Sequence, residues 1–207
     1  MYIGIAGNIG SGKSAMSQLL ADEFGFRTSD GDKDATNPYL ANFYSDMPRW
    51  ALNLQIYFLT RRFKSVQRAM WSTDVVVQDR TIYEDACVFV ENLLAMQIIS
   101  RQDYDTYRDL FDVMSSFIKP PELLIYLKAS VPTLMSHIRQ RGVAYEAGIS
   151  YEYLAMLNRR YEEWVETYRG DILTIDIDNT DFVSNAADRA KVIDAIKSQL
   201  GTRARAR

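Results

Sequence analysis

A glycine-rich stretch near the start of the chain has the residue types and spacing that hold phosphate. Residues 7–14 read G-N-I-G-S-G-K-S and match the pattern G-x-x-x-x-G-K-[ST]. In such a loop the backbone N–H groups point into one concavity, and the N-terminus of the next helix adds partial positive charge. Lys13 can reach the β- and γ-phosphates of ATP, and the Ser14 hydroxyl can bind Mg²⁺. The predicted ATP-binding residues are Gly7, Asn8, Ile9, Gly10, Ser11, Gly12, Lys13 and Ser14.

The segments on either side of this loop decide between a phosphate site and an ordinary glycine turn. The apolar run 2–6 predicts a buried parallel strand, and the apolar residues of 16–24 recur with helical spacing. A strand, a glycine loop and a helix in this order are the context that the phosphate-binding mechanism needs. The flanks therefore favour the phosphate site.

A second charged stretch, Asp79-Arg80, directly follows the apolar run 75–78. In open α/β sheets, ligands bind outside the carboxyl ends of the strands. A carboxylate at Asp79 can hold Mg²⁺ there, directly or through water, and Arg80 can contact the transferred phosphate or the attacking oxygen. Taken alone, the stretch also fits a solvated charged loop; beside a phosphate loop, the catalytic interpretation is favoured.

A helical segment further along the chain offers groups that could read a base. Gln55 and Arg62 are seven residues apart and share one helix face, whereas Arg61 points about 100° away. A glutamine amide can bond two edge atoms of a base, and Arg62 can pair with an acidic residue, for which Asp85 is the candidate. Nearby apolar residues form a stripe that is more often core than binding surface: Trp50, Leu54, Tyr57 and Phe58.

The segment 137–146 combines arginines with a glycine. It suits a mobile lid, with Arg141 bringing positive charge over the phosphates. It equally suits the C-terminus of a helix that carries basic residues and ends at Gly142. The sequence leaves both interpretations open.

Buried strands are expected at 2–6, 75–78, 123–127 and 172–175, with a weaker fifth near 26–28. Helical patterns separate them at about 13–24, 38–72, 81–117, 131–141, 150–169 and 183–200. This alternation predicts an α/β fold, a five-stranded parallel sheet flanked by helices. The expected single domain covers 1–200, with the lid at about 139–149 and a basic, disordered tail at 201–207.

The composition is that of an ordinary globular protein, with 47% hydrophobic and 25% charged residues. The net charge of −3 does not favour a nucleic-acid partner. The single cysteine, Cys87, excludes an internal disulfide, which is compatible with a cytoplasmic location. No signal peptide is expected from Met1-Tyr2-Ile3-Gly4, and no apolar run reaches the ~18 residues of a membrane span.

These motifs together resemble the deoxynucleoside kinase family, especially its bacterial deoxyadenosine/deoxyguanosine kinase branch. The resemblance covers about 1–178. It rests on the glycine loop and on further segments: Asn37-Pro38-Tyr39-Leu40, Arg49-Trp50 with Gln55, Asp79-Arg80-Thr81 with Asp85, Arg141-Gly142, and Tyr161-Glu162-Glu163-Trp164.

The resemblance implies the P-loop kinase fold and transfer of the γ-phosphoryl group of ATP to the 5′-hydroxyl of a deoxynucleoside in salvage. It implies that Gln55, Arg62 and Asp85 read the base, which favours deoxyadenosine, another purine or deoxycytidine over thymidine. It also implies that Tyr44 and Glu146 hold the sugar 3′-hydroxyl. Arg80 would stabilise the 5′-oxygen and the transferring group, Arg141 would be a lid arginine, and two copies would form a homodimer.

The chain departs from the family pattern at its general base, a glutamate five residues before the Asn of Asn-Pro-Tyr. Counting back from Asn37 reaches Asp32, and Asp30 is a competing candidate. An aspartate is one methylene shorter, which affects its reach to the hydroxyl. In the lid, His137 and Val143 stand where the family has arginines, with Arg139 as a candidate replacement. Asp79 stands where many members have glutamate.

Two other functions fit part of the pattern. A nucleoside monophosphate kinase, such as a thymidylate kinase, would share the glycine loop and an Asp-Arg pair, but the spacing of Gln55, Arg62 and Asp85 counts against it. A catalytically weak relative acting as a structural or regulatory partner would explain the altered base and lid. The intact Lys13 and Arg80 argue against that reading.

Overall fold

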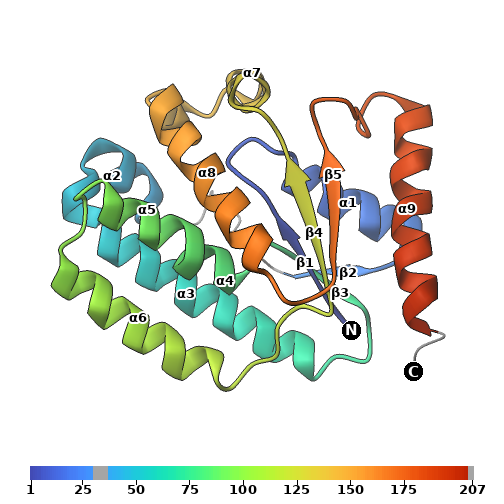
Figure 1. Ribbon diagram of the computed structural model, residues 1–207, viewed down its shortest axis with the longest axis horizontal. Helices are drawn as coiled ribbons and strands as arrows, with labels where there is room; N and C mark the ends of the chain where they lie inside the picture. The colour runs from blue at the N-terminus through green and yellow to red at the C-terminus, as the bar shows by residue number, and fades with distance from the viewer. Residues whose placement is uncertain (30–36, 205–207) are drawn as a thin grey trace.

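Five parallel strands form one sheet at the centre of the protein (Figure 1). The computed structural model describes residues 1–29 and 37–204, with side chains described to Gly201. The strands are β1 (Tyr2–Ala6), β2 (Arg27–Thr28), β3 (Val76–Asp79), β4 (Leu123–Lys128) and β5 (Ile172–Asp176), in the order β2-β3-β1-β4-β5. Every neighbouring pair is parallel.

The central strands are buried because helices cover both faces of the sheet. All of β1 and the first five residues of β4 are buried, as their unbroken apolar runs predict. The expected α/β class and five-stranded parallel sheet are confirmed. One boundary differs, since Asp79 is the last residue of β3 and pairs with Ile5 of β1.

The helices lie in two layers around the sheet (Figure 1). On one side of the sheet lie α3 (Met47–Met70), α4 (Ile82–Glu84), α5 (Val90–Ala95), α6 (Arg101–Ser115) and α8 (Tyr151–Thr167). On the other side lie α1 (Lys13–Phe24) and α9 (Ala186–Ala204), whereas α7 (Val131–Arg141) lies near the carboxyl end of β4. The carboxyl edge of the sheet is therefore where the loops can build a site.

Both of the long helical segments expected from the sequence are interrupted. The 38–72 segment divides into α2 (Leu40–Ser45) and α3, and the break lies at Asp46, whose side chain accepts a hydrogen bond from Arg49 N. Pro48 in the first turn of α3 strengthens this start.

The 81–117 segment contains α4, a π-helical turn η2 (Asp85–Phe89) and α5, and Ser100 then caps α6. Capping residues therefore divide a segment whose apolar residues recur with helical spacing throughout.

The C-terminal helix α9 continues to Ala204, past residue 200, where the domain was expected to end. Residues 205–207 lie outside the described part of the chain. Within residues 1–29 and 37–204, none of the helices has the length and apolar character that crossing a membrane requires.

Candidate functional site

The glycine loop connects β1 to α1 in a conformation that its glycines permit. Gly10 has a φ of 84° and Gly12 a φ of 93°, both in the left-handed region that side chains disfavour. A Cβ atom at Gly10 would lie 2.8 Å from the carbonyl oxygen of Leu134 in α7. Glycine is needed here both for the backbone angle and for the close approach of α7.

The loop is held in place by α8. Asn8 is buried, and its Nδ2 donates to the carbonyl of Leu154 at 3.0 Å and to Oδ1 of Asn158 at 2.7 Å. The carbonyl of Asn8 in turn accepts a hydrogen bond from Lys13 Nζ at 2.8 Å. The lysine head group is thus directed back over the loop by a carbonyl that α8 fixes.

Lys13 is largely buried in the wall of the cavity, and this burial changes its pKa. Burial, reinforced by the positive charge of Arg80, lowers the pKa of Lys13 from 10.5 to about 7. Asp79 and Glu84 oppose this shift but do not cancel it. A polyanion bound at the loop would favour the charged form of Lys13.

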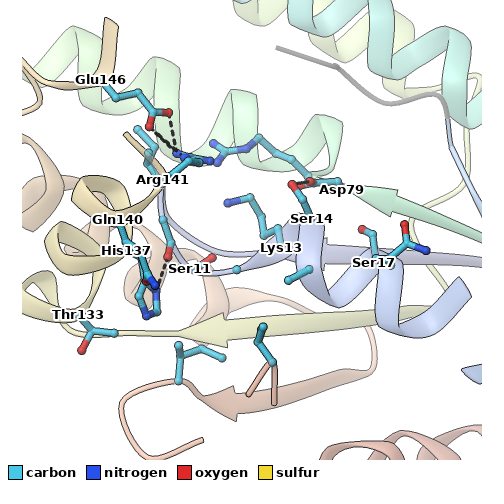
Figure 2. Close-up of a pocket in the computed structure, with 18 of the residues that line it drawn as sticks. Ser11, Lys13, Ser14, Ser17, Asp79, Thr133, His137, Gln140, Arg141 and Glu146 are labelled. Atoms are coloured by element: carbon cyan, nitrogen blue, oxygen red, sulfur yellow. Dashed lines mark hydrogen bonds and ion pairs between the residues drawn. The ribbon is translucent and has the colours of Figure 1, made fainter. Parts of the chain in front are cut away.

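Ser14 and Asp79 bring two hard oxygen ligands together at the mouth of the loop (Figure 2). Ser14 Oγ donates to Asp79 Oδ2 at 2.6 Å. The described residues contain no group of three or more His, Cys, Asp or Glu side chains that could cage a metal ion. Mg²⁺ needs no such cage, because it is commonly held by one or two protein oxygens together with substrate phosphates and water. Ser14 and Asp79 therefore fit this ion.

Arg80 follows β3 in a strained backbone conformation. Its φ is 65°, which is uncommon for a residue with a side chain. Its backbone N–H donates to the carbonyl of Ile5 at 2.9 Å, and its guanidinium carbon lies 4.2 Å from the centre of the Phe89 ring. The side chain lines the same cavity as Lys13. Such strain is often found at functional sites.

The same cavity is also lined by Gln55, Arg62 and Asp85. All three are buried, and a hydrogen-bonded ion pair joins Arg62 Nη1 to Asp85 Oδ2. The guanidinium carbon of Arg62 also lies 4.4 Å from the centre of the Phe58 ring. Among the described residues, Gln55 Oε1 is buried without a hydrogen-bond partner. This part of the cavity wall therefore offers hydrogen-bond donors and acceptors beside an aromatic ring.

Arg141, at the end of α7, pairs with Glu146 in the short 3-10 turn η3 (Ala144–Glu146) (Figure 2). Arg141 Nη2 lies 2.6 Å from Glu146 Oε1, and Arg141 Nε lies 3.1 Å from Oε2. Tyr145 of the same turn stacks on Tyr44 of α2, with ring centres 5.9 Å apart. The segment after α7 therefore contacts α2, whose Tyr44 lines the cavity.

At one of the positions where the family has a further lid arginine, this chain has His137. His137 lies on α7, and its Nδ1 is 2.8 Å from the carbonyl oxygen of Gly10. Arg139, the candidate replacement, is exposed and is not among the described residues that line the cavity. His137 contacts the phosphate loop itself.

One cavity of about 930 Å³ connects these groups. The structure brings ten of the residues singled out in the sequence to its wall: Ile9, Gly10, Ser11, Gly12, Lys13, Ser14, Tyr44, Gln55, Arg62 and Asp79. The cavity is also lined by Arg80, Asp85, Arg141 and Glu146, by His137, and by Leu54 and Phe58 of the apolar stripe. Gly7 and Asn8, at the start of the loop, do not line the cavity, and Asp30 and Asp32 lie outside the described residues.

Other parts of the site were not predicted. The segment 177–184, which follows β5, lines the cavity near the phosphate loop, and the ring of Phe182 lies 3.5 Å from where a Cβ on Gly12 would be. Tyr153 of α8 also lines it. The fully buried Glu84 was overlooked too, although Thr81-x-x-Glu84 matches the sequence signal of a helix capping box.

The strand, the glycine loop, the five-stranded parallel sheet and the shared cavity define a kinase of the P-loop fold. The model of the deoxynucleoside kinase family matches residues 3–200, so the chain belongs to that family.

Two curated relatives show the extent of the similarity. The deoxyadenosine/deoxycytidine kinase of Bacillus subtilis is 36% identical over 199 residues, which cover 95% of this chain and 91% of that one. The deoxyguanosine kinase of Lactobacillus acidophilus is also 36% identical, over 95% of this chain and 89% of that one.

Among solved structures, a deoxyadenosine kinase from M. mycoides with the products dCMP and a flexible dCDP bound superposes with a TM-score of 0.84. It is 28% identical and covers 96% of this chain and 100% of its own. The same enzyme has been solved with dATP, and that structure gives a TM-score of 0.78 at 30% identity over 86% of this chain and 92% of its own.

Proposed function

We propose that this protein transfers the γ-phosphoryl group of ATP to the 5′-hydroxyl of a deoxynucleoside. The observation that carries the proposal is one cavity that is lined both by the phosphate loop and by Gln55, Arg62 and Asp85. A volume of about 930 Å³ lies at the upper end of the range usual for small-molecule sites. Two substrates can therefore meet in it, as direct transfer requires.

The donor end binds triphosphate through charge and backbone N–H groups. Lys13 contacts the β- and γ-phosphates, and residues 9–14 surround them at the N-terminus of α1. Ser14 and Asp79 would hold Mg²⁺, which would supply positive charge beside the phosphates. The protein supplies the fixed geometry of the loop, which α7 and α8 support.

The acceptor end reads the base. Gln55 can donate and accept, Arg62 donates, and Asp85 accepts. An acceptor at Asp85 favours a base that presents an exocyclic amino group, as adenine and cytosine do. We therefore propose deoxyadenosine or another purine deoxynucleoside as substrate, with deoxycytidine as a further candidate. The names of the relatives, which include deoxyadenosine, deoxyguanosine and deoxycytidine kinases, support this range.

The remaining predicted groups act on the sugar and on the reacting atoms. Tyr44 and Glu146 hold the 3′-hydroxyl, Arg80 stabilises the 5′-oxygen and the transferring group, and Arg141 acts from the lid at about 139–149. Glu146 is buried and faces Arg141, so sugar binding at Glu146 would release Arg141 toward the phosphates. Asp32 takes the proton of the 5′-hydroxyl as general base.

Replacing Asp32 with alanine is expected to lower kcat by about 10²-fold or more, because general-base catalysis contributes at least that much. Asp30→Ala is the matched control, since it removes the same carboxylate two residues away. Steady-state kinetics of both variants decide which aspartate is the general base. If Asp30→Ala loses the rate while Asp32→Ala keeps it, the assignment moves to Asp30.

ATP binding is expected to take up protons above pH 7. Lys13 has a pKa of about 7, and the bound phosphates raise it. Between the two pKa values the complex holds a proton that the unbound protein lacks, so uptake approaches about one proton per ATP at about pH 8.5. Calorimetry in two buffers of different ionisation enthalpy measures this number. Equal apparent enthalpies in both buffers would contradict the shifted pKa.

The proposed reaction is tested by incubating the protein with γ-labelled ATP, Mg²⁺ and each of the four deoxynucleosides in turn. We expect label in the 5′-monophosphate of at least one purine deoxynucleoside or of deoxycytidine, and least with thymidine. The proposal fails if no deoxynucleoside accepts the label.

We further propose that residues 1–200 form one catalytic domain that works in the cytoplasm as a homodimer. The exposed side of α6 supports the dimer, because Leu110 and Val113 are exposed on this helix and Phe117 is exposed in the turn just after it. A second copy of this chain would cover that face. Sedimentation equilibrium that gives only the monomer mass at micromolar concentration would contradict this.

A further inference from the structure

The carboxylate of Glu84 lies fully buried where three separate segments of the protein meet. Its Oε1 accepts hydrogen bonds from Gly7 N at 3.2 Å and from the hydroxyl of Tyr161 at 2.9 Å. Its Oε2 accepts from Thr81 N at 2.6 Å. Gly7 opens the phosphate loop, Thr81 follows Arg80, and Tyr161 belongs to α8.

Two of these bonds go beyond ordinary helix capping. A capping box needs only the reciprocal bonds between Thr81 and Glu84, and both are present. Gly7 and Tyr161 are each 77 residues away from Glu84 in the chain. A buried carboxylate is costly unless donors satisfy it, and all three of its partners donate.

The bonds to Gly7 and Thr81 fix the two loops that border the phosphates. Thr81 comes directly after Arg80, whose backbone is held at a φ of 65°. Gly7 N is the first amide of the glycine loop, and a Cβ at Gly7 would lie 2.8 Å from the carbonyl oxygen of Leu127. One carboxylate therefore connects the two loops directly.

We propose that Glu84 is a positioning residue for phosphoryl transfer, which holds the phosphate loop and Arg80 in one fixed relation, and that Tyr161 orients its carboxylate. The inference rests on the reaction proposed above. Glu84 touches neither substrate in this account, because the described residues that line the cavity do not include it. It acts through Gly7 on the donor side and through Thr81 on Arg80.

The variant Glu84→Gln tests this role, because glutamine keeps the shape but replaces one accepting oxygen with an NH₂ donor. That group must face Thr81 N on one side or Gly7 N and Tyr161 on the other. We expect the KM for ATP to rise and kcat to fall, with a combined loss in kcat/KM of about 10²-fold, the effect of a misplacement of about 1 Å. The Kd for the deoxynucleoside should change by less than about threefold, because the pairing of Arg62 with Asp85 remains.

Tyr161→Phe provides a milder second variant. It removes one donor and leaves the carboxylate in place, so we expect the same pattern with a loss of about fivefold. In the double variant, Tyr161→Phe should add nothing to the effect of Glu84→Gln, because the hydroxyl acts through the carboxylate.

Glu91→Gln is the matched control. It makes the same chemical change in a carboxylate that accepts a hydrogen bond from the hydroxyl of Tyr104, outside the residues that line the cavity. Its kinetic constants should equal those of the wild type.

ATP binding is measured by calorimetry alongside the kinetics, so the inference is tested even if no deoxynucleoside is phosphorylated. A wild type that binds ATP but transfers no label would overturn the proposed reaction. A Glu84→Gln variant with wild-type affinity for ATP and wild-type kcat would overturn the positioning role. Equal losses of affinity for ATP and for the deoxynucleoside would also overturn it, since they would indicate a general loosening of the fold.

Discussion

Lys13→Ala is expected to abolish phosphoryl transfer while leaving the fold intact. The ammonium group is the positive charge that the phosphate loop directs at the β- and γ-phosphates, and a preorganised charge of this kind contributes about 10²–10³-fold or more to kcat. Deoxynucleoside binding should persist, because the proposed base-reading residues are Gln55, Arg62 and Asp85 and the substitution leaves all three in the cavity wall.

The same substitution should not destabilise the protein. Burial lowers the pKa of Lys13 to about 7, which means that the folded state disfavours its charge. In the unfolded chain Lys13 has its ordinary pKa of 10.5, so the unfolded state binds more protons than the folded state between pH 7 and 10.5. The contribution of Lys13 to stability is therefore lowest at low pH and rises over that range. Removing the side chain removes that cost, so Lys13→Ala should melt at or above the wild-type temperature at neutral pH.

Transfer assays and thermal melts of Lys13→Ala and of Lys191→Ala test both statements. Lys191 is an exposed lysine of α9 that pairs with Asp188. Its removal should leave turnover unchanged. Normal turnover in Lys13→Ala would refute the assignment of the phosphate loop.

Asp85→Ala carries the second large expected effect. It leaves the buried guanidinium of Arg62 without the carboxylate that it pairs with, and breaking a buried ion pair in this way typically costs about 3–5 kcal/mol of stability. Deoxynucleoside affinity should fall by about 10- to 100-fold, because a charged acceptor for the base is lost. Denaturant unfolding and calorimetry measure the two quantities.

A second substitution separates stability from recognition. In Arg62→Met/Asp85→Ala both charges are gone, so most of the stability should return while deoxynucleoside affinity stays low. Asp112→Ala is the control, because it breaks an exposed pair with Arg108 and should change stability by less than about 1 kcal/mol. Wild-type affinity in Asp85→Ala would show that Asp85 does not read the base.

The sequence predicts the central strands and the glycine loop well because their signals are local. The apolar run 123–127 is buried because it forms a central strand covered on both faces, and G-x-x-x-x-G-K-[ST] specifies its own turn. The expected burial of 172–175 is only partly right, because β5 lies at the edge of the sheet and only Ile175 of that run is buried. Gln55 and Arg62 could be assigned to one helix face from their spacing alone. Their placement beside Asp85 follows from the packing of α3 against α4 and η2.

Two kinds of feature were not predicted from the sequence: helix breaks at local caps, and contacts between residues far apart in the chain. The breaks at Asp46 and Ser100 rest on caps that compete with a continuous helical period. In the sequence Glu84 can be recognised only as a capping residue. Its bonds to Gly7 and Tyr161 each span 77 residues, so no local pattern indicates them. His137 looked like a lost lid arginine, and only the approach of α7 to the loop brings it to Gly10.

The central claim is that the acceptor is a nucleoside, and one competition measures it most directly. The protein is incubated with γ-labelled ATP and equal concentrations of deoxyadenosine and its 5′-monophosphate, and the labelled products are separated. A nucleoside kinase site, with Gln55, Arg62 and Asp85 around the base, predicts label in the monophosphate. Label confined to the diphosphate would contradict the account and indicate a nucleoside monophosphate kinase instead.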